Sequence, residues 1–242
     1  MQTPLKPIKS FSTPVVLVGG GEIAWEQLQL IRQHSYPMIG VDSGANALRL
    51  HDIITDLVIG DLDSISELAS FPQTTDTIKV SEQQTTDFEK ALYTIDAPLF
   101  ICFGFWGDRL DHCLSALHVL TKYRGQKRVL LIDQADLIFT PQKTLEMEIG
   151  IKTRFSIYPL KTTNFLTSSG FLYPLDGLTV EAGKLMSTSN ETTQSRIFLT
   201  TTEETKSNYV VILPNSKLQS VIDWLRKLEI LPMIKLKTLQ VR

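Results

Sequence analysis

The sequence predicts an α/β N-terminal domain with a mainly parallel, Rossmann-like sheet, followed by an all-β sandwich domain. Short apolar runs alternate with helical segments as far as Asp133, a pattern typical of parallel strands joined by crossover helices. After Pro141 the helical period disappears, and short branched or aromatic runs are separated by glycine, proline, asparagine and serine. We expect the α/β domain at 1–140, the sandwich at 141–216, and a C-terminal helix and tail at 217–242.

The first half contains six predicted strands and four predicted helices. Apolar runs predict strands at 15–18, 38–41, 56–59, 77–80, 99–103 and 129–132. Amphipathic segments predict helices at 24–33, 45–50, 86 onward and 111–123. Thr86 and Glu89 form a capping-box pattern, which indicates where the third of these helices begins.

The second half reads as strands at 155–158, 178–180, 197–199 and 209–212. The Ser/Thr-rich stretch at 187–193 lies between apolar strands, so we expect an ordered turn there. A helical period returns at 217–228, with Val221, Leu225 and Leu228 on one stripe.

Composition excludes several classes of protein. The net charge of −2 over 242 residues provides no basic field for general nucleic-acid binding. Cys102 and Cys113 lack metal-ligand spacing and are expected to be reduced core thiols. The sequence has no apolar run of membrane-spanning or signal-peptide length. We therefore expect a cytoplasmic protein with no membrane or nucleic-acid partner.

Asp61 and Asp63 follow the predicted strand at 56–59 and, in an extended segment, point to the same side. Two such carboxylates suit Mg²⁺, which is usually held by one or two carboxylates together with substrate phosphates. The pair alone is equally consistent with capping of a following helix, with Ser64 as a turn residue.

Other glycine and acidic residues also follow predicted strands, where ligands bind in parallel sheets. They are Gly19 to Gly21, Asp42, Gly104 and Gly107. Asp87 stands at the start of its helix on the same edge and could join Asp61 and Asp63 around one metal ion. The helix dipole and Thr86 explain its position equally well.

Arg109 lies in a glycine-bounded loop and presents a planar fork that matches phosphate. Asp111 could cap the next helix or hold a cationic substrate, and His112 is more typical of a polar cap than of a general base. The sequence lacks a complete dinucleotide fingerprint, a Gly-Lys-Ser/Thr phosphate loop and a Gly-x-Ser-x-Gly elbow. A Rossmann dehydrogenase, a P-loop kinase and an acyl transferase are therefore disfavoured. Two or three carboxylates around magnesium leave positions open for phosphate oxygens, so phosphoryl or diphosphoryl transfer, or hydrolysis, is the natural chemistry.

Four ordered motifs resemble those of the thiamine pyrophosphokinase family. The family's motifs run Asp-Gly-Gly-Ala-Asn, Gly-Asp-Phe-Asp-Ser, Gln-x-x-Thr-Asp-Phe-x-Lys and Gly-Gly-Arg-x-Asp-His. This chain has Asp-Ser-Gly-Ala-Asn at 42–46, Gly-Asp-Leu-Asp-Ser at 60–64, Gln-Gln-Thr-Thr-Asp-Phe-Glu-Lys at 83–90 and Gly-Asp-Arg-Leu-Asp-His at 107–112. The stretches 170–175 and 187–190 resemble the family's C-terminal signature.

The resemblance implies transfer of a diphosphoryl group from the co-substrate ATP to thiamine, giving thiamine diphosphate and AMP, in a homodimer with shared sites. It implies that Asp61, Asp63 and Asp87 hold Mg²⁺ and that Arg109 joins them in catalysis. The residues it places at the nucleotide and phosphates are Asp42, Asn46, Gln83, Thr86, Lys90, Gly104 and Gly107. Those it places at the thiamine are Asp111, Tyr173, Ser187, Ser189 and Asn190. A tyrosine in the sandwich core is an equally good reading of Tyr173.

Three residues depart from the family pattern. Ser43 and Asp108 stand where glycine is usual, and Gln84 stands where an acidic residue is common. Alternative functions are a pyrophosphokinase for another small alcohol such as a hydroxymethylpterin, and a non-catalytic regulator that binds thiamine or nucleotide. A magnesium-dependent phosphatase or glycosyltransferase is a third.

Overall fold

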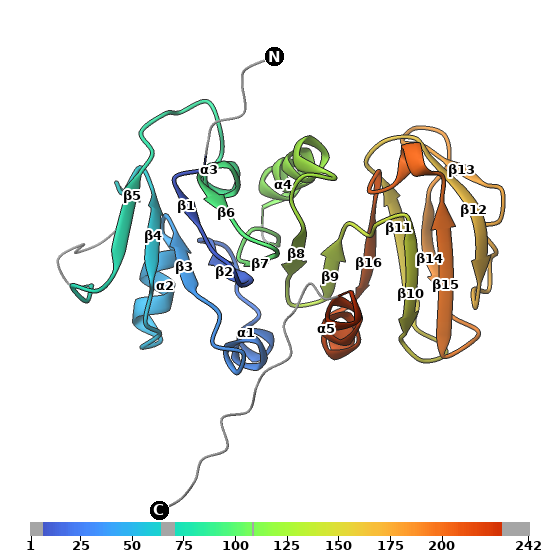
Figure 1. Ribbon diagram of the computed structural model, residues 1–242, viewed down its shortest axis with the longest axis horizontal. Helices are drawn as coiled ribbons and strands as arrows, with labels where there is room; N and C mark the ends of the chain where they lie inside the picture. The colour runs from blue at the N-terminus through green and yellow to red at the C-terminus, as the bar shows by residue number, and fades with distance from the viewer. Residues whose placement is uncertain (1–6, 64–70, 108, 229–242) are drawn as a thin grey trace, which may run out of the picture.

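One ten-stranded sheet runs through both halves of the chain in the computed structural model (Figure 1). The structure describes residues 7–63, 71–107 and 109–228. The expectations for Ser64, Asp108 and the tail therefore concern positions outside the described residues. Of the helices in the described part, none is long and apolar enough to cross a membrane.

Six neighbouring strands of this sheet are parallel, in the order β5-β4-β3-β2-β7-β8. All six begin within one residue of their predicted positions. They are β2 (Val15–Val18), β3 (Met38–Val41), β4 (Leu57–Gly60), β5 (Asp76–Lys79), β7 (Phe100–Phe103) and β8 (Val129–Ile132). The predicted parallel sheet is thus confirmed, whereas the finer label Rossmann-like stays a prediction. A two-residue pair, β1 (Lys9–Ser10) with β6 (Ile95–Asp96), lies beside it.

Helices cover both faces of the parallel strands (Figure 1). Successive residues of a strand face opposite sides, so Leu17 joins the core that contains Val119, while Val16 joins the core that contains Leu28. Helices α3 (Asp87–Thr94) and α4 (Leu110–Tyr123) supply the first core. Helices α1 (Trp25–Arg32), α2 (Gly44–Leu50) and α5 (Leu218–Lys227) supply the second.

The rest of the long sheet is antiparallel and forms one layer of the sandwich. This layer contains β9 (Asp136–Phe139), β16 (Tyr209–Pro214), β11 (Arg154–Pro159) and the edge strand β14 (Ser187–Glu191). The second layer is a four-stranded sheet of β10 (Thr144–Glu148), β15 (Arg196–Thr201), β12 (Thr163–Ser169) and β13 (Thr179–Val180). Phe155 and Val211 of one layer share a buried core with Leu145 and Leu199 of the other. Because the long sheet crosses residue 141, the domain boundary there stays a prediction.

The second half differs from expectation at two places. The stretch 187–193, expected as a turn, contains the strand β14, which pairs with β11. Because β14 lies at the edge of the sheet, it buries few side chains and its sequence is polar. Strands β9, β10 and β12 were not expected. In β10, Leu145 and Met147 alternate with exposed residues, a period-two signal that identifies a half-buried strand.

Helix starts and stripes were largely predictable. Thr86 caps α3, and its hydroxyl accepts a hydrogen bond from the Glu89 N–H at 3.3 Å. The Glu89 carboxylate, however, ion-pairs with Lys122 and accepts a hydrogen bond from the Tyr123 hydroxyl at 3.1 Å. In α5, Val221 and Leu225 are buried as expected, whereas Leu228 follows the helix end and is exposed.

Candidate active site

The strand order reverses between β2 and β7, and glycine turns follow both strands there. The Gly21 N–H donates a hydrogen bond to the Gly104 carbonyl at 3.0 Å. A Cβ on Gly19 would lie 2.7 Å from the Gly104 oxygen, and Gly104 has a φ of +71°. Only glycine permits the two turns to approach so closely. A crevice at such a reversal is where open α/β sheets bind ligands.

Three carboxylates gather beside these turns. Ligand oxygens of Asp42, Asp61 and Asp63 lie within 4.8 Å of one another. Asp42 follows β3 with a φ of +51°, and its N–H donates to the Ile59 carbonyl at 2.8 Å. This left-handed residue turns the chain across the end of β4. The parallel register therefore brings Asp42 to the two aspartates that follow the neighbouring strand.

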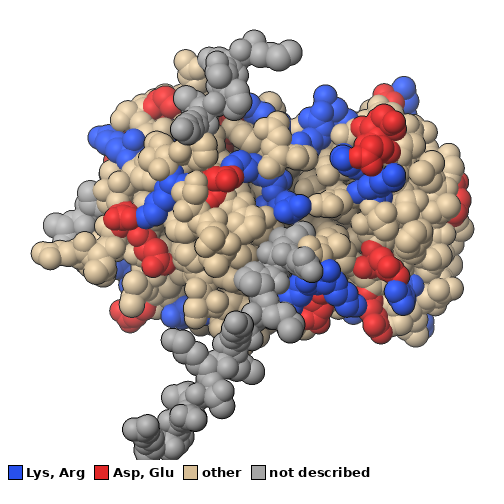
Figure 2. All heavy atoms as spheres, viewed as in Figure 1, with Lys and Arg blue, Asp and Glu red and all other residues tan. Residues whose placement is uncertain are grey.

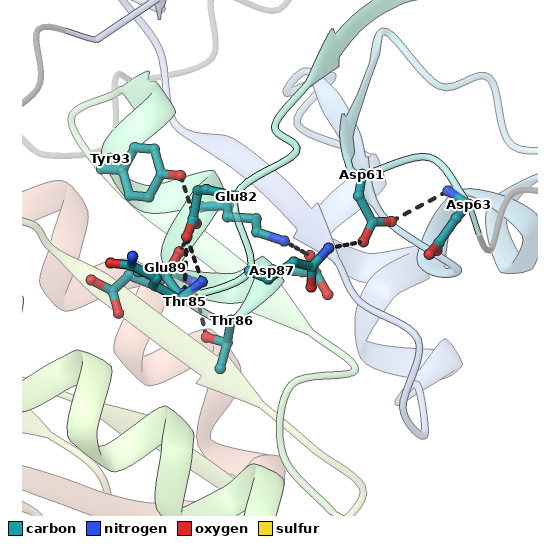
Figure 3. A network of polar contacts seen from close by, with 11 residues as sticks. Asp61, Asp63, Glu82, Thr85, Thr86, Asp87, Glu89 and Tyr93 are labelled. Atoms are coloured by element: carbon teal, nitrogen blue, oxygen red, sulfur yellow. Dashed lines mark hydrogen bonds and ion pairs between the residues drawn. The ribbon is translucent and has the colours of Figure 1, made fainter.

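The residues at 83–90 reach the same region from α3 and the loop before it (Figure 3). The Gln83 amide donates to Asp61 Oδ2 at 3.0 Å, and this bond is the main cause that lowers the pKa of Asp61. Lys90, whose side chain is 3% exposed, ion-pairs with Asp87 at 3.0 Å. Lys90 also lowers the pKa of Asp61 electrostatically, so this one cation acts on both carboxylates.

A cavity of about 630 Å³ opens over the glycine turns. Its size falls in the range of small-molecule sites. Predicted site residues that line it are Asp42, Thr86, Asp87, Gly104, Gly107, Arg109 and Asp111. Of the other predicted residues, Asp61 and Asp63 lie beside the cavity, with carboxylate oxygens within 4.8 Å of an oxygen of Asp42. Gln83 is hydrogen-bonded to Asp61, and Lys90 is ion-paired with Asp87.

Ser43 fits the glycine position of the family motif without strain. It adopts a right-handed φ of −57°, so the positive φ that serine disfavours is not required of it. The left-handed residue is Asp42 instead. The Ser43 hydroxyl occupies the space beside Gly20, where a Cβ would lie only 2.0 Å from it. The departure at Ser43 is thus accommodated by the glycine opposite.

Arg109 and Asp111 form a two-bonded fork at the cavity rim. Arg109 Nε donates to Asp111 Oδ1 at 3.1 Å and its Nη2 donates to Oδ2 at 2.6 Å. The Arg109 side chain is 65% exposed, which leaves the pair accessible to a ligand. The guanidinium is the main cause that holds the pKa of Asp111 below its usual value. The pair is both a surface salt bridge and part of the cavity lining.

The sandwich residues of the C-terminal signature lie on and beside β14. Asn190 is 2% exposed; it accepts from the Tyr173 N–H at 3.1 Å and donates to the Tyr173 carbonyl at 2.8 Å. Tyr173 is 62% exposed, so the reading of it as a core tyrosine is wrong. The Ser189 N–H donates to the Ser156 hydroxyl at 2.9 Å. Asn190 therefore presents Tyr173 to solvent, and among the described cavity-lining residues none comes from this region.

Sequence reasoning missed three features of the cavity. Asp42 joins the acidic cluster, and no local pattern indicates its left-handed turn. Phe105 and Trp106 line the cavity, and Phe105 stacks on Phe88 with ring centroids 4.5 Å apart. Cys113, expected in the core, is half-buried, and its thiol donates to the Gly107 carbonyl at 3.1 Å. The position of Phe105 and Trp106 between two glycines could have identified them as cavity residues. For Cys113 the signal is its position one helical turn after this loop.

A glycine-lined cavity and an acidic cluster at the carboxyl edge of a parallel sheet, joined to a β-sandwich, place the protein in the class of α/β proteins with a ligand crevice at that edge and donors suited to a hard cation. Comparison with known proteins specifies the class further. Residues 28–132 match the family model "Thiamin pyrophosphokinase, catalytic domain", and residues 143–205 match "Thiamin pyrophosphokinase, vitamin B1 binding domain". The chain belongs to the thiamin pyrophosphokinase family.

Curated relatives agree with this assignment, and solved structures agree with the fold. Thiamine pyrophosphokinase of Bacillus subtilis is 31% identical over 65% of this chain and 79% of its own length. Thiamin pyrophosphokinase 1 of Caenorhabditis elegans is 28% identical over 59% of this chain and 65% of its own length, so just under two thirds of that relative is spanned. The fold is similar to thiamin pyrophosphokinase from Geobacillus thermodenitrificans (TM-score 0.68, 24% identity, 84% of this chain and 97% of that one). It is also similar to the Candida albicans enzyme (TM-score 0.70, 17% identity, 88% and 94%).

Proposed function

We propose that the protein transfers a diphosphoryl group from ATP to the hydroxyl of thiamine and releases AMP. The observation that carries the proposal is the position of the acidic cluster beside a cavity that glycine turns and Arg109 line. Glycine amides and a guanidinium suit phosphate oxygens, and the cluster supplies the hard ligands that a phosphate-bound cation requires. The family to which the chain belongs supports thiamine as the acceptor.

Mg²⁺ fits the acidic cluster by the chemistry of its donors. Three carboxylates whose oxygens lie within 4.8 Å repel one another, and a hard divalent cation relieves that repulsion. Asp61, Asp63 and Asp42 would hold it, and Asp87 remains a predicted fourth ligand whose charge Lys90 now balances. When bound, the cation neutralises charge on the phosphate oxygens.

The chain's own residues would position the nucleotide and its phosphates. Arg109 at the rim would neutralise charge that develops on the transferring diphosphoryl group and on the departing AMP, and Gly104 and Gly107 let the phosphates approach the backbone. Thr86, Gln83, Lys90 and Asn46 complete the predicted nucleotide set. One of Asp61, Asp63 and Asp87 would accept the proton of the attacking hydroxyl.

We propose that a second copy of the chain completes the thiamine site. Tyr173, Ser187 and Ser189 would contact thiamine, with Asn190 holding the Tyr173 loop and Asp111 at the cavity rim. The sandwich residues do not appear among the described residues that line the cavity, so one subunit's sandwich would serve the other subunit's cavity. Exposed apolar side chains beside the edge strand β14 support association there; these are Leu172, Tyr173, Leu185 and Met186.

The test is to incubate the purified protein with thiamine, ATP and magnesium and to quantify AMP and thiamine diphosphate. Equal amounts of both products, abolished by EDTA, are expected. ADP with thiamine monophosphate would contradict the proposed transfer, and activity with a hydroxymethylpterin would favour the related pyrophosphokinase. Phosphate or sugar release without AMP would indicate the phosphatase or glycosyltransferase. Thiamine binding without product would indicate the regulator.

Shared sites have their own test. An Asp61→Asn protein, deficient in kcat, is mixed with a Tyr173→Ala, Ser189→Ala protein, deficient in thiamine binding, under conditions that exchange subunits, and the mixture is assayed at a thiamine concentration so low that neither variant alone shows appreciable activity. Hybrid dimers then contain one site with both halves intact, so activity is expected to return. A mixture that stays inactive although mixed dimers form would contradict shared sites.

A further inference from the structure

Glu82 lies in the loop between β5 and α3, outside the residues so far assigned to the site. Its carboxylate accepts four hydrogen bonds (Figure 3). The Gln84 N–H donates at 2.7 Å, the Thr85 N–H at 3.1 Å and the Tyr93 hydroxyl at 3.1 Å, and the Thr85 hydroxyl is the fourth donor. An ionised carboxylate is an acceptor only, with room for four donors, so this environment matches its charged form.

We propose that Glu82 is a positioning residue for diphosphoryl transfer. It folds the loop into the shape in which Gln83 reaches Asp61 and Asp87 enters the cavity. This inference rests on the proposed function, because its kinetic consequence is measured on that reaction.

Glu82 anchors the loop to helix α3 through Tyr93. Tyr93, the most distant of its donors in sequence, lies in α3 beyond the helix's first turn, and burial raises the pKa of Tyr93 to about 12. Helix α3 is in turn joined to α4 through Glu89, which is 5% exposed and binds Lys122 and Tyr123. The start of the loop is therefore fixed relative to two packed helices.

The rest of the loop positions the side chains of Gln83 and Asp87. Gln83, the residue next to Glu82, is exposed and donates to Asp61 at 3.0 Å. The two N–H groups that Glu82 binds belong to the following residues, so the backbone turns sharply there and Thr86 can begin α3 with Asp87 in its first turn. An unsupported loop would sample many positions for these groups, and small displacements of catalytic groups are costly in rate.

The kinetic test compares Glu82→Ala and Glu82→Gln with Glu204→Ala, an exposed glutamate of the sandwich half. Glu82→Ala is expected to lower kcat by about 10²-fold, the cost of a displacement near 1 Å. The KM for thiamine should change little, because the predicted thiamine residues lie elsewhere. Glu82→Gln keeps one oxygen for the two backbone donors and should retain most of the activity; Glu204→Ala should retain all of it.

A second readout does not depend on activity. Amide hydrogen exchange at Gln84 and Thr85 is expected to accelerate in Glu82→Ala while the strands of the parallel sheet stay protected. Tyr93→Phe, which removes one donor and leaves the carboxylate, should show a weaker acceleration and a kcat loss of a few-fold. It serves as the test variant if Glu82→Ala does not fold.

Unchanged loop exchange in Glu82→Ala, or wild-type kcat despite faster exchange, would overturn the positioning role. A kcat loss that only follows a loss of folded protein would overturn it as well. Failure of the proposed function has a different signature, since the wild-type protein would then form no AMP and thiamine diphosphate. The affinity of Glu82→Ala for α,β-methylene-ATP, measured by calorimetry, would in that case replace kcat: a weakened affinity supports the inference and an unchanged one overturns it.

Discussion

The carboxyl edge of the parallel sheet and the outer edge of the sandwich position their candidate site residues by different means. At the first, strand order and register bring Asp42 and Asp61 together from neighbouring strands, and the glycines at the strand ends permit close approach. At the second, a single buried side chain positions the loop, because Asn190 makes hydrogen bonds to the backbone of Tyr173.

This difference separates chemistry from scaffold. Asp61 is accessible, and the main cause of its lowered pKa is a neighbouring amide, so substitution there should affect activity and leave the fold intact. Asn190 is buried, so its substitution should affect stability as well as substrate binding. Mutations that separate these two effects test the comparison.

The largest effect is expected for Asp61→Asn. Removing one charge from the acidic cluster should lower kcat by about 10²–10³-fold, as does the loss of a group that stabilises transition-state charge. Thermal stability should not fall, because one repulsion among three carboxylates is relieved. AMP formation and a thermal melt measure the two quantities. Asp52→Asn, at an exposed aspartate that does not line the cavity, is the control and should be fully active. Equal activity of both variants would contradict the role of Asp61.

Asn190→Ala should reverse this pattern. The variant leaves the partly buried Tyr173 N–H and carbonyl without their partner, which costs about 1 kcal/mol or somewhat more. For a chain of this size, 1 kcal/mol corresponds to roughly 2–4 °C in Tm, so we expect a fall of about 5 °C together with a higher KM for thiamine. Ser187→Ala, on the same strand, should leave Tm unchanged. A wild-type Tm in Asn190→Ala would refute the scaffold role.

Much of the parallel half was predictable because its strands, the exposed edge strand β5 excepted, are buried on both faces and read as continuous apolar runs that end at glycine or aspartate. Asp42 was expected near the nucleotide, but its membership of the acidic cluster depends on a left-handed φ and on the register with β4, neither of which a single sequence records. In the sandwich, β14 was missed because edge strands carry polar residues. The exposure of Tyr173 could not be predicted either, because it depends on which loop Asn190 binds.

Tyr173→Ala should have a smaller effect, confined to thiamine. The ring is exposed and packs little in one subunit, so Tm should not change. Loss of a stacking surface for the flat cationic substrate should raise the KM for thiamine by about 5- to 10-fold, equivalent to roughly 1 kcal/mol, with kcat preserved. Tyr173→Phe keeps the ring and is the control that should behave as wild type. A fall in kcat with unchanged KM would place Tyr173 outside the thiamine site.

The smallest effect is expected at Cys113, whose thiol holds Gly107 at the cavity rim. Cys113→Ala removes only weak sulfur hydrogen bonds, so the KM for ATP should rise by about threefold, which corresponds to roughly 0.6 kcal/mol.

The two cysteines also provide an internal comparison in the native protein. Complete burial raises the pKa of Cys102 well above its usual value, whereas Cys113 is half-buried and should react first with a thiol reagent. If nucleotide occupies the cavity beside Gly107, ATP with magnesium should slow the labelling of Cys113 and leave Cys102 unreactive. Labelling of Cys113 at the same rate with and without nucleotide would show that the glycine loop does not contact the phosphates.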